Sequence, residues 1–217
     1  MINIYKNNDD PRLSRVFSPA LAPTNPSDPI VGTDYGAASN SNLQTQQFSY
    51  IGTGLAKSAS QPQWLITSVE NMFMYAEAVA RGWLPGDARQ AYENAVRESF
   101  VWLGVPNPVT AAETYMTGHP IANWAFAGTT VAQQVRFIGY QKYIAMAGFN
   151  PLEAWNLYRR LDVLTTNPPL SVHPDKLGNG NLPIRYLYPS TEYAVNTESV
   201  LAQGTINMFT SKVFWDK

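Results

Sequence analysis

The residues of this chain that could carry acid, base or metal chemistry are few and widely spaced. Its two histidines, His119 and His173, fall in loops that contain proline and glycine. Neither has the i, i+4 partner or the clustered carboxylates that a catalytic metal needs. Cysteine is absent, which excludes disulfides, thiolate metal sites and a cysteine nucleophile within these residues. We therefore predict no metal site and no cofactor, and we interpret both histidines as surface loop residues.

Three carboxylates remain as candidates for general acid chemistry. Glu77 falls in the middle of an expected helix beside its apolar stripe, where it could act as an acid or anchor an arginine or a loop amide. Asp9 and Asp10 precede Pro11, where aspartates normally make turn hydrogen bonds, although a pair of acids could serve a glycosidase. We favour the structural roles. Because no nucleophile elbow, phosphate-binding loop or dinucleotide-binding glycine pattern is present, we predict that the protein is not an enzyme.

Aromatic side chains are the remaining resource for binding. The chain has 6 tryptophans, 12 tyrosines and 9 phenylalanines, more than four short helices need for packing. Trp124, Tyr115, Tyr35 and Tyr50 fall in polar loops, where an exposed ring offers a flat face to a sugar ring or another apolar ligand surface. We take these four as candidate ligand-binding residues. The alternative is that each ring pins its own loop to the body of the protein.

Four helices are expected to position these residues, and their first turns are well marked. Each expected start pairs an N-capping residue with an acidic or amide residue three positions later, a pattern that satisfies the free amides of the first turn. The pairs are Thr67 with Glu70, Asp87 with Gln90, Thr130 with Gln133, and Asn150 with Glu153. The four pairs therefore predict where the helices begin.

Apolar periodicity groups the four helices into two hairpins. In the first helix apolar residues recur at three- and four-residue steps from Val69 onward, and Trp83 and Trp155 lie on such stripes and are expected in the core. The third helix, about residues 131–146, and the fourth, about 151–161, are joined by a short turn. The sequence therefore predicts a mainly α fold of two tetratricopeptide-like helix hairpins, repeat-like only, with long irregular loops and little β structure.

The segments outside the hairpin helices are expected to be irregular. The connection between the hairpins, residues 104–129, holds three prolines and one expected helical turn around residues 111–116. Prolines also break the beginning of the chain, and its end carries one expected short strand at residues 212–215. We interpret the whole chain as a single domain or fragment in three parts, which are an irregular lead-in (1–63), the helical hairpins (64–162) and an irregular C-terminal wrap (163–217).

Length and charge limit the classes of protein and partner. With 217 residues, 45% of them hydrophobic, the chain can bury a real core. Lys and Arg number 15 against 16 Asp and Glu, so the net charge of -1 lacks the basic field that a nucleic acid partner needs. The first residues lack the pattern of a signal peptide, and no window has the long apolar run of a membrane span. We expect no nucleic acid partner, and we expect any lipid anchor to lie outside these residues.

Several short motifs, taken in order along the chain, resemble those of one protein family. They are Asp9-Asp10-Pro11-Arg12-Leu13, Tyr75-Ala76-Glu77-Ala78, Arg81-Gly82-Trp83, Ala91-Tyr92, Arg97-Glu98-Ser99-Phe100, Gln141-Lys142-Tyr143, Glu153-Ala154-Trp155 with the residues up to Arg160, and Pro183-Ile184-Arg185-Tyr186-Leu187-Tyr188-Pro189. In this order they resemble the C-terminal portion of the SusD-like (RagB/SusD) outer-membrane lipoproteins. The matching motifs are mostly framework residues, so the resemblance transfers no ligand-contact position.

The resemblance implies a function for the full-length protein. Members of this family sit at the extracellular face of the outer membrane on a SusC-like TonB-dependent transporter, and they capture oligosaccharides, or sometimes peptides, for nutrient uptake without catalysis. Their fold is mainly helical, with irregular insertions that carry the ligand site. A full-length member has a signal peptide, a lipidated cysteine and an N-terminal helical half. The resemblance therefore implies a fragment, attached to the membrane only through a lipid anchor that these residues lack.

We therefore predict a cell-surface glycan-binding component of a nutrient uptake system. Two alternatives stay open, namely a peptide-binding member of the same family and a helical-repeat scaffold that docks onto a protein partner without binding glycans. The scaffold hypothesis predicts a large apolar patch on the hairpin faces. A carbohydrate-active enzyme would instead need two carboxylates that face each other across a cleft.

Overall fold

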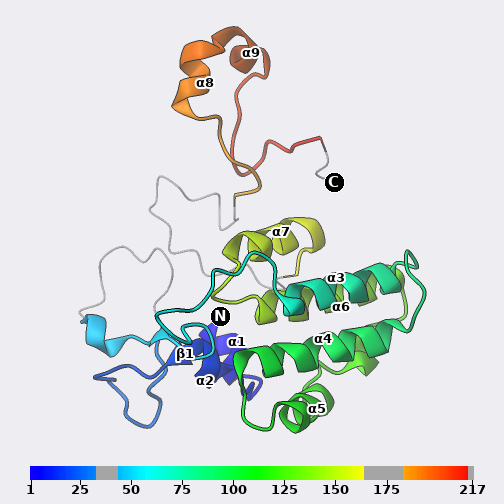
Figure 1. Ribbon diagram of the computed structural model, residues 1–217. Helices are drawn as coiled ribbons and strands as arrows, with labels where there is room; N and C mark the ends of the chain where they lie inside the picture. The colour runs from blue at the N-terminus through cyan, green and yellow to red at the C-terminus, as the bar shows by residue number, and fades with distance from the viewer. Residues whose placement is uncertain (33–43, 164–182, 215–217) are drawn as a thin grey trace. The chain divides into compact units, whose positions relative to one another are not determined.

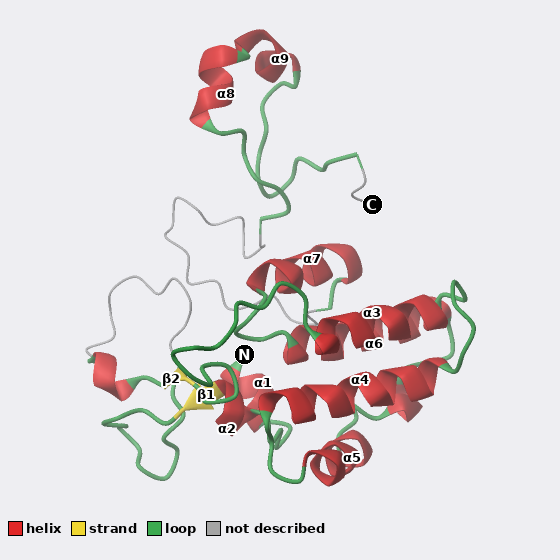
Figure 2. Cartoon of the chain, in the orientation of Figure 1, coloured by secondary structure: helices red, strands yellow, loops and turns green. Residues whose placement is uncertain are grey.

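The computed structural model describes residues 1–32, 44–163 and 183–214, which are mainly helical (Figures 1 and 2). The chain divides into two compact units. The described residues up to Val163 belong to the first unit, and residues 183–214 belong to the second. Two residues singled out in the sequence, Tyr35 and His173, lie outside the described residues.

The first helix hairpin consists of α3 (Ser68–Ala80) and α4 (Ala88–Leu103), which pack side by side (Figure 2). The hydroxyl of Thr67 accepts a hydrogen bond from the amide of Glu70 at 3.1 Å, and the carboxylate of Asp87 caps α4 in the same way at 3.0 Å. Each cap contributes roughly 1 kcal/mol to helix stability because it satisfies an otherwise free amide. Both predicted helix starts are confirmed.

The second hairpin consists of α6 (Val131–Ala145) and α7 (Pro151–Leu161). Thr130 begins α6 with a full capping box, and the side chain of Asn150 accepts a hydrogen bond from the amide of Glu153 at 3.1 Å. α6 also packs against α3 and α4, which joins the two hairpins. The predicted fold class, mainly α with two hairpins and little β structure, is confirmed.

The core of the first unit lies between α3, α4 and α6. Its members are apolar or aromatic side chains with almost no exposed surface, among them Phe73, Ala76, Tyr92, Ala95, Phe100, Val135, Ile138 and Ile144. Each large side chain contributes about 1.5–3 kcal/mol when it leaves water, and the alanines let the helices approach closely. The hydroxyl of Tyr92 donates to the carbonyl of Ala122 at 2.7 Å, which ties the long connection to this core.

That connection is more regular than the sequence indicated. Instead of one turn around residues 111–116, the structure has an 11-residue helix, α5 (Pro108–Gly118), followed by a short 3-10 turn, η2 (Trp124–Phe126). Asn107 precedes the helix and Pro108 occupies its first position, where the missing amide of proline leaves no hydrogen bond unmade. The expectation of an irregular connection was wrong because Pro108 starts a helix here and does not break one.

The lead-in also contains regular elements. Two short helices, α1 (Ile2–Lys6) and α2 (Leu13–Val16), precede the strand β1 (Phe17–Ser18), which pairs antiparallel with β2 (Tyr50–Ile51); a 3-10 turn, η1 (Thr45–Gln47), comes just before β2. The two strands form a small antiparallel sheet. Prolines interrupt most of this segment, but none occurs among the first ten residues. The prediction of an irregular lead-in is therefore only partly correct.

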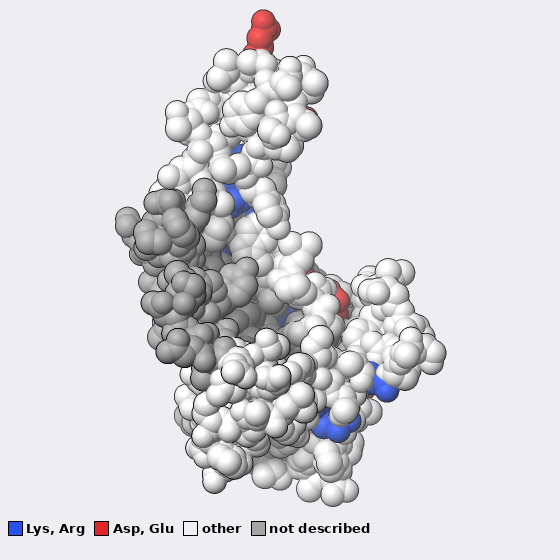
Figure 3. All heavy atoms as spheres, turned by 90° about the vertical axis from the view of Figure 1, so that its left-hand side faces the viewer, with Lys and Arg blue, Asp and Glu red and all other residues white. Residues whose placement is uncertain are grey.

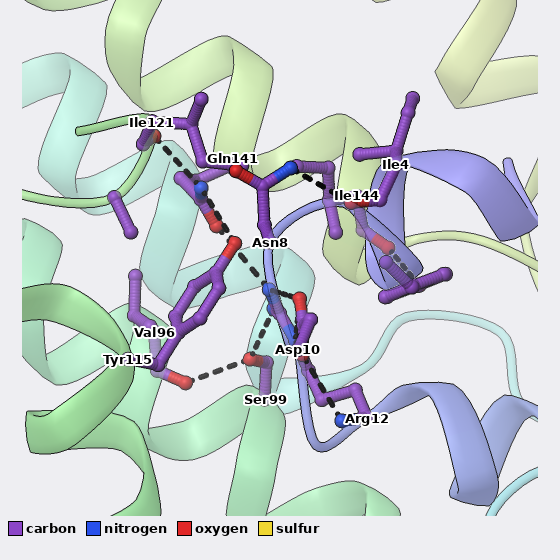
Figure 4. Close-up of polar contacts among 12 residues, drawn as sticks. Ile4, Asn8, Asp10, Arg12, Val96, Ser99, Tyr115, Ile121, Gln141 and Ile144 are labelled. Atoms are coloured by element: carbon purple, nitrogen blue, oxygen red, sulfur yellow. Dashed lines mark hydrogen bonds and ion pairs between the residues drawn. The ribbon is translucent and has the colours of Figure 1, made fainter. Parts of the chain in front are cut away.

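A buried arginine fixes this lead-in to the helices (Figure 4). The guanidinium of Arg12 is 0% exposed, pairs with the carboxylate of Asp10 at 2.6 Å and donates to the hydroxyl of Ser99 on α4 at 2.9 Å. Its carbon lies 4.8 Å from the ring centre of Phe100 and 5.1 Å from that of Tyr115. Burial alone would lower the pKa of Arg12, but the charge of Asp10 raises it above its ordinary value, so the guanidinium stays charged.

The amide of Gln141 on α6 extends this buried network (Figure 4). Its oxygen accepts from the guanidinium of Arg12 at 3.3 Å, and its nitrogen lies 3.2 Å from the hydroxyl of Tyr115 and donates to the carbonyl of Ile121 at 2.9 Å. Every polar atom of this amide therefore has a partner, as a buried amide requires. The network joins the lead-in, α4, α5 and α6 at one point.

The second unit contains two short helices, α8 (Ser190–Val195) and α9 (Thr197–Ala202). The amide of Ile184 donates to the carbonyl of Met208 at 2.8 Å, which brings the two ends of the described segment together. Residues 212–214 are not in a strand, and residue 215 lies outside the described residues. The predicted terminal strand is therefore wrong for residues 212–214, which are the described part of its range.

We expect Asp10→Ala to lower the free energy of unfolding of the first unit by about 3–5 kcal/mol, because it leaves the buried guanidinium of Arg12 without its counter-charge. Urea denaturation followed by circular dichroism measures this. Asp28→Ala is the matched control, because its pair with Lys6 at 2.5 Å is solvent-exposed and should contribute only about 0.2–1 kcal/mol. Equal losses in the two variants would contradict a special role for the buried pair.

Candidate ligand-binding site

The four aromatic residues predicted from the sequence lie in different surroundings. Tyr115 lies on α5, not in a loop, and is 2% exposed. Burial raises the pKa of its hydroxyl to about 12. Tyr50 is partly exposed on β2, and Tyr35 lies outside the described residues. Among the described residues, no ring contact joins Tyr115 or Tyr50 to Trp124.

Trp124 is half-buried on η2 and packs against the helices. Its ring centre lies 5.3 Å from that of Tyr92 and 6.2 Å from that of Phe137, edge to face in the second case. This packing pins the connection to the helical core, which is the structural alternative considered for this residue. Phe126, two positions further along, is largely exposed. As ligand-binding residues, Trp124, Tyr115, Tyr50 and Tyr35 stay predictions.

Two other tryptophans, Trp83 and Trp155, are more exposed than the sequence predicted. Trp83 was expected in the core but is 71% exposed, because the chain leaves α3 at Arg81 and turns through Gly82, which has a positive φ of 74°. The guanidinium of Arg81 lies over the Trp83 ring at 5.1 Å. Trp155 on α7 is half-buried, and the guanidinium of Arg159 lies 4.8 Å from its ring centre. The helical stripe does not extend past the end of the helix.

A cluster of three aromatic rings was not predicted. We call these rings the aromatic cluster; they belong to Trp64, Trp102 and Phe149. The ring centre of Trp102 lies 4.7 Å from that of Trp64 and 4.8 Å from that of Phe149. The ring centres of Trp64 and Phe149 are 6.2 Å apart. Trp64 meets both other rings edge to face, an arrangement favoured by the charge distribution of aromatic rings. All three side chains are half-buried, so the cluster keeps part of its surface in contact with solvent.

Each ring of the aromatic cluster comes from a different part of the fold. Trp64 lies in the irregular segment before α3, Trp102 in the last turn of α4, and Phe149 in the turn between α6 and α7. Gly148 shapes that turn, because its φ of 89° suits glycine and a Cβ there would come within 2.4 Å of Leu55. The cluster therefore forms only when both hairpins and the lead-in are folded together.

A surface pocket of about 340 Å³ lies beside the aromatic cluster. Its lining includes the rings of Trp64 and Phe149 and the amide side chains of Gln61 and Gln63, and it contains no ionisable side chain. The amide oxygen of Gln61 accepts from the backbone of Lys57 at 2.9 Å, which holds its side chain in place. A few fixed polar groups beside aromatic rings are typical of sites for small neutral ligands.

A larger pocket of about 420 Å³ near the N-terminus is a weaker candidate. Its aromatic residue, Tyr5, is 1% exposed and uses its hydroxyl to donate to the carbonyl of Ile144 at 2.7 Å. Of its charged residues, Lys6 pairs with Asp28 and Asp10 pairs with Arg12, which leaves Asp9. Few free groups therefore remain there to recognise a ligand.

Two of the three carboxylates considered for catalysis, Glu77 and Asp10, have structural partners, whereas the carboxylate of Asp9 has no hydrogen bond or ion pair within the described residues. Glu77 pairs with Arg81 on its own helix at 2.8 Å and with Arg160 on α7. Burial would raise the pKa of Glu77, but hydrogen bonds and charge from Arg160 and Arg81 outweigh it and hold the pKa below its usual value. Asp10 is held by Arg12. These carboxylates therefore join segments of the fold.

The described residues offer neither a metal cluster nor a membrane-spanning helix. No cluster of three or more histidine or acidic side chains that could hold a metal occurs in ranges 1–32, 44–163 and 183–214. Within the same ranges, none of the helices is long and apolar enough to cross a membrane.

The sequence contains one feature that could have indicated this site. Gln61, Pro62, Gln63 and Trp64 place two amides and an indole together in a short irregular segment before a helix. Such a segment presents its side chains to solvent because it has no apolar periodicity. The other two rings could not have been found in this way, since only tertiary folding brings Trp102 and Phe149 to Trp64.

Comparison with known proteins identifies the family and the fold. A family model described as "Starch-binding associating with outer membrane" (SusD-like) matches residues 1–189. A search of curated protein sequences gives no significant match. Two SusD homologues of known structure from Bacteroides fragilis resemble the chain with TM-scores of 0.68 and 0.70, at 23% and 21% sequence identity. A solved chitin-binding protein resembles it with a TM-score of 0.68 at 25% identity.

The structural matches extend over almost all of this chain but over only about half of each relative. Each of the three structures matches 99% of this chain, while the match covers 50%, 50% and 48% of the respective relative. The chain therefore spans about half the length of the solved structures that it matches.

We expect Glu77→Gln to change how stability depends on pH. A lowered pKa in the folded state stabilises the protein above the unfolded value of about 4.5, and this contribution is lost as pH falls through the folded pKa. Urea denaturation between pH 7 and pH 3 should therefore show a steeper loss in the native protein than in the variant. At pH 7 the variant should lose about 1.5–3 kcal/mol, the usual range for hydrogen bonds to charged groups.

Glu113→Gln is the control for this experiment, because its carboxylate is exposed and lies 3.6 Å from Arg97. Its pH profile should follow that of the native protein. If Glu77→Gln gave the same profile as well, the interpretation of Glu77 as a clamp between α3 and α7 would fail.

Proposed function

The chain belongs to the SusD-like family, described as starch-binding and associating with the outer membrane, and we propose that it captures a neutral glycan at the aromatic cluster. The observation that carries the proposal is the pocket beside Trp64 and Phe149, where two glutamine amides lie next to aromatic rings. In this proposal the glycan is bound and passed on, and no bond is cut.

The pocket suits the two kinds of surface that a sugar offers. The C–H face of a pyranose ring packs on an aromatic ring, and its hydroxyl groups exchange hydrogen bonds with amides. The oxygen of Gln61 already accepts from the backbone of Lys57, and the nitrogen of Gln63 donates to the carbonyl of Trp64 at 3.3 Å. The nitrogen of Gln61 and the oxygen of Gln63 remain, so the pair offers a hydroxyl both a donor and an acceptor. A volume of about 340 Å³ lies near the lower end of small-ligand sites, which suits a short stretch of glycan.

Charge also favours a neutral ligand. Charged residues make up 14% of the chain, and on the face drawn in Figure 3 the described Lys, Arg, Asp and Glu side chains are sparse. The lining of the pocket has no ionisable group with which to pair a uronic acid or a sulfated sugar. Outside the lining, the ammonium of Lys57 lies 4.7 Å from the ring centre of Trp102 and donates to the carbonyl of that residue, so the preference for a neutral ligand applies to the pocket itself.

We further propose that the full-length protein works at the extracellular face of the outer membrane with a SusC-like TonB-dependent transporter. Support comes from the family description, which names association with the outer membrane. Support for binding without catalysis comes from Glu77 and Asp10, whose carboxylates are each held by arginines.

A second candidate function is peptide capture, or docking onto a protein partner without any glycan. Leu65 and Ile66 follow Trp64 and are 89% and 70% exposed. Two neighbouring aliphatic side chains in solvent are a suitable contact for an apolar peptide or protein surface. Oligosaccharide titration separates glycan capture from peptide capture and docking.

We expect Trp64→Ala to weaken glycan binding by at least tenfold, because truncating a central aromatic contact typically costs more than 1.4 kcal/mol. Titration calorimetry with maltooligosaccharides and chitooligosaccharides on the full-length protein measures this. Trp64→Phe should retain more of the affinity, since it keeps a ring at this position.

Trp124→Ala is the control and also the competing hypothesis from the sequence. Binding unchanged by this variant but lost in Trp64→Ala supports the site at the aromatic cluster. The reverse pattern keeps the function and moves the site to residues 104–129. If neither oligosaccharide series binds the native protein, peptide capture or docking becomes the better proposal.

A further inference from the structure

A second pocket, of about 360 Å³, lies where the lead-in meets α5, and no lining residue is shared with the pocket at the aromatic cluster. We infer that this pocket, which we call the Asp9 pocket, binds a single neutral pyranose unit. The residues used in the argument are Asp9, Asn107, Thr110, Thr114, Tyr115 and His119. The inference takes its ligand class from the proposed function, but it stands on different residues.

The polar side chains of the Asp9 pocket are available to a ligand. Within the described residues, neither the carboxylate of Asp9 nor the amide of Asn107 nor the imidazole of His119 has a hydrogen bond to the protein. With the hydroxyls of Thr110 and Thr114, these groups offer several acceptors and donors within one small space. A pyranose carries several hydroxyl groups on one ring, so one sugar can meet several of these groups at once.

The floor of the Asp9 pocket is rigid because it belongs to the buried network. Tyr115 packs against the guanidinium of Arg12 at 5.1 Å, and its hydroxyl lies 3.2 Å from the amide nitrogen of Gln141 (Figure 4). The ring of His119 lies 5.5 Å from that of Tyr115 at an angle of 34°. The pocket is therefore largely formed before a ligand arrives, which lowers the entropy lost on binding.

The backbone on both sides of the Asp9 pocket adopts an unusual conformation. Asp9 and Asn107 have positive φ angles of 43° and 47°, and in the described residues only one other non-glycine residue, Asp162, does so. Such conformations persist where the surrounding structure holds them, and they concentrate at binding sites. Here they place a carboxylate and an amide at the same opening.

The charge of the Asp9 pocket selects the class of sugar. Asp9 is its acidic residue, and the lining has no lysine or arginine. A carboxylate accepts strong hydrogen bonds from hydroxyl groups but repels a second carboxylate. While the imidazole of His119 in the same lining is uncharged, a neutral sugar such as glucose should therefore bind, whereas glucuronate, which has the same ring with a carboxylate, should be rejected.

The test uses the small number of histidines. Within these residues the histidines are His119 and His173, and in the nuclear magnetic resonance spectrum of a histidine-labelled sample of the full-length protein the signal that disappears in His119→Gln is that of His119. The titration is done in Trp64→Ala with glucose at millimolar concentrations. We expect saturable shifts of the His119 signals, and at least tenfold weaker binding of glucuronate at the same pH.

Asp9→Asn tests the specificity. Asparagine keeps the size of the side chain and tolerates the positive φ at this position, so the fold should be kept. We expect about tenfold weaker glucose binding together with loss of the discrimination against glucuronate. Glu113→Gln, on the same helix but outside the lining, should change neither.

The possible outcomes are distinct for the two proposals. His119 signals unmoved by glucose, while oligosaccharides still bind through Trp64 in the native protein, would overturn the Asp9 pocket and leave the proposed function intact. Shifts that glucuronate produces equally, or that Asp9→Asn leaves unchanged, would also overturn it. Saturable shifts in Trp64→Ala would support this pocket even if the aromatic cluster bound nothing.

Discussion

The architecture of the first unit depends on one buried cation. Arg12 enters from the lead-in, yet its guanidinium ends between Phe100 and Tyr115 and reaches the polar side chains of Asp10, Ser99 and Gln141. Burying such a pair adds little net stability compared with a well-packed apolar core, because both ions lose their water. The pair instead fixes how the segments are arranged, because the planar guanidinium donates hydrogen bonds in only a few directions. The crossing of the lead-in over α4, α5 and α6 is thereby fixed.

The helix hairpins and the segments outside them contribute differently to the candidate binding surfaces. The hairpins supply a helical body, and the candidate pockets lie where segments outside the hairpin helices pack against it. The aromatic cluster uses the segment before α3 and the turn after α6, and the Asp9 pocket uses the lead-in and the start of α5. Ligand sites on connections carried by a stable scaffold are common, because loops can change without disturbing the core.

The sequence was informative where the cause of structure is local. Caps such as Thr67 and Thr130 act on amides within one turn, so a short window predicts them and the helices begin where expected. Trp83 was misplaced because a helical stripe says nothing about the direction of the chain after Gly82. Tyr115 was assigned to a loop because the helix around it lacks a clear apolar stripe. The contacts of Trp64 with Trp102 and Phe149 depend on long-range packing, which no local pattern contains.

The origin of the aromatic cluster has a further consequence. Its three rings are contributed by the segment before α3, by the end of α4 and by the turn between α6 and α7, so the surface exists only while these parts are docked. A molecule that binds this surface must stabilise the docked state by mass action, and the stabilisation grows with its concentration. Since proteases cut chains that open, a molecule bound at the aromatic cluster also slows proteolysis of the first unit.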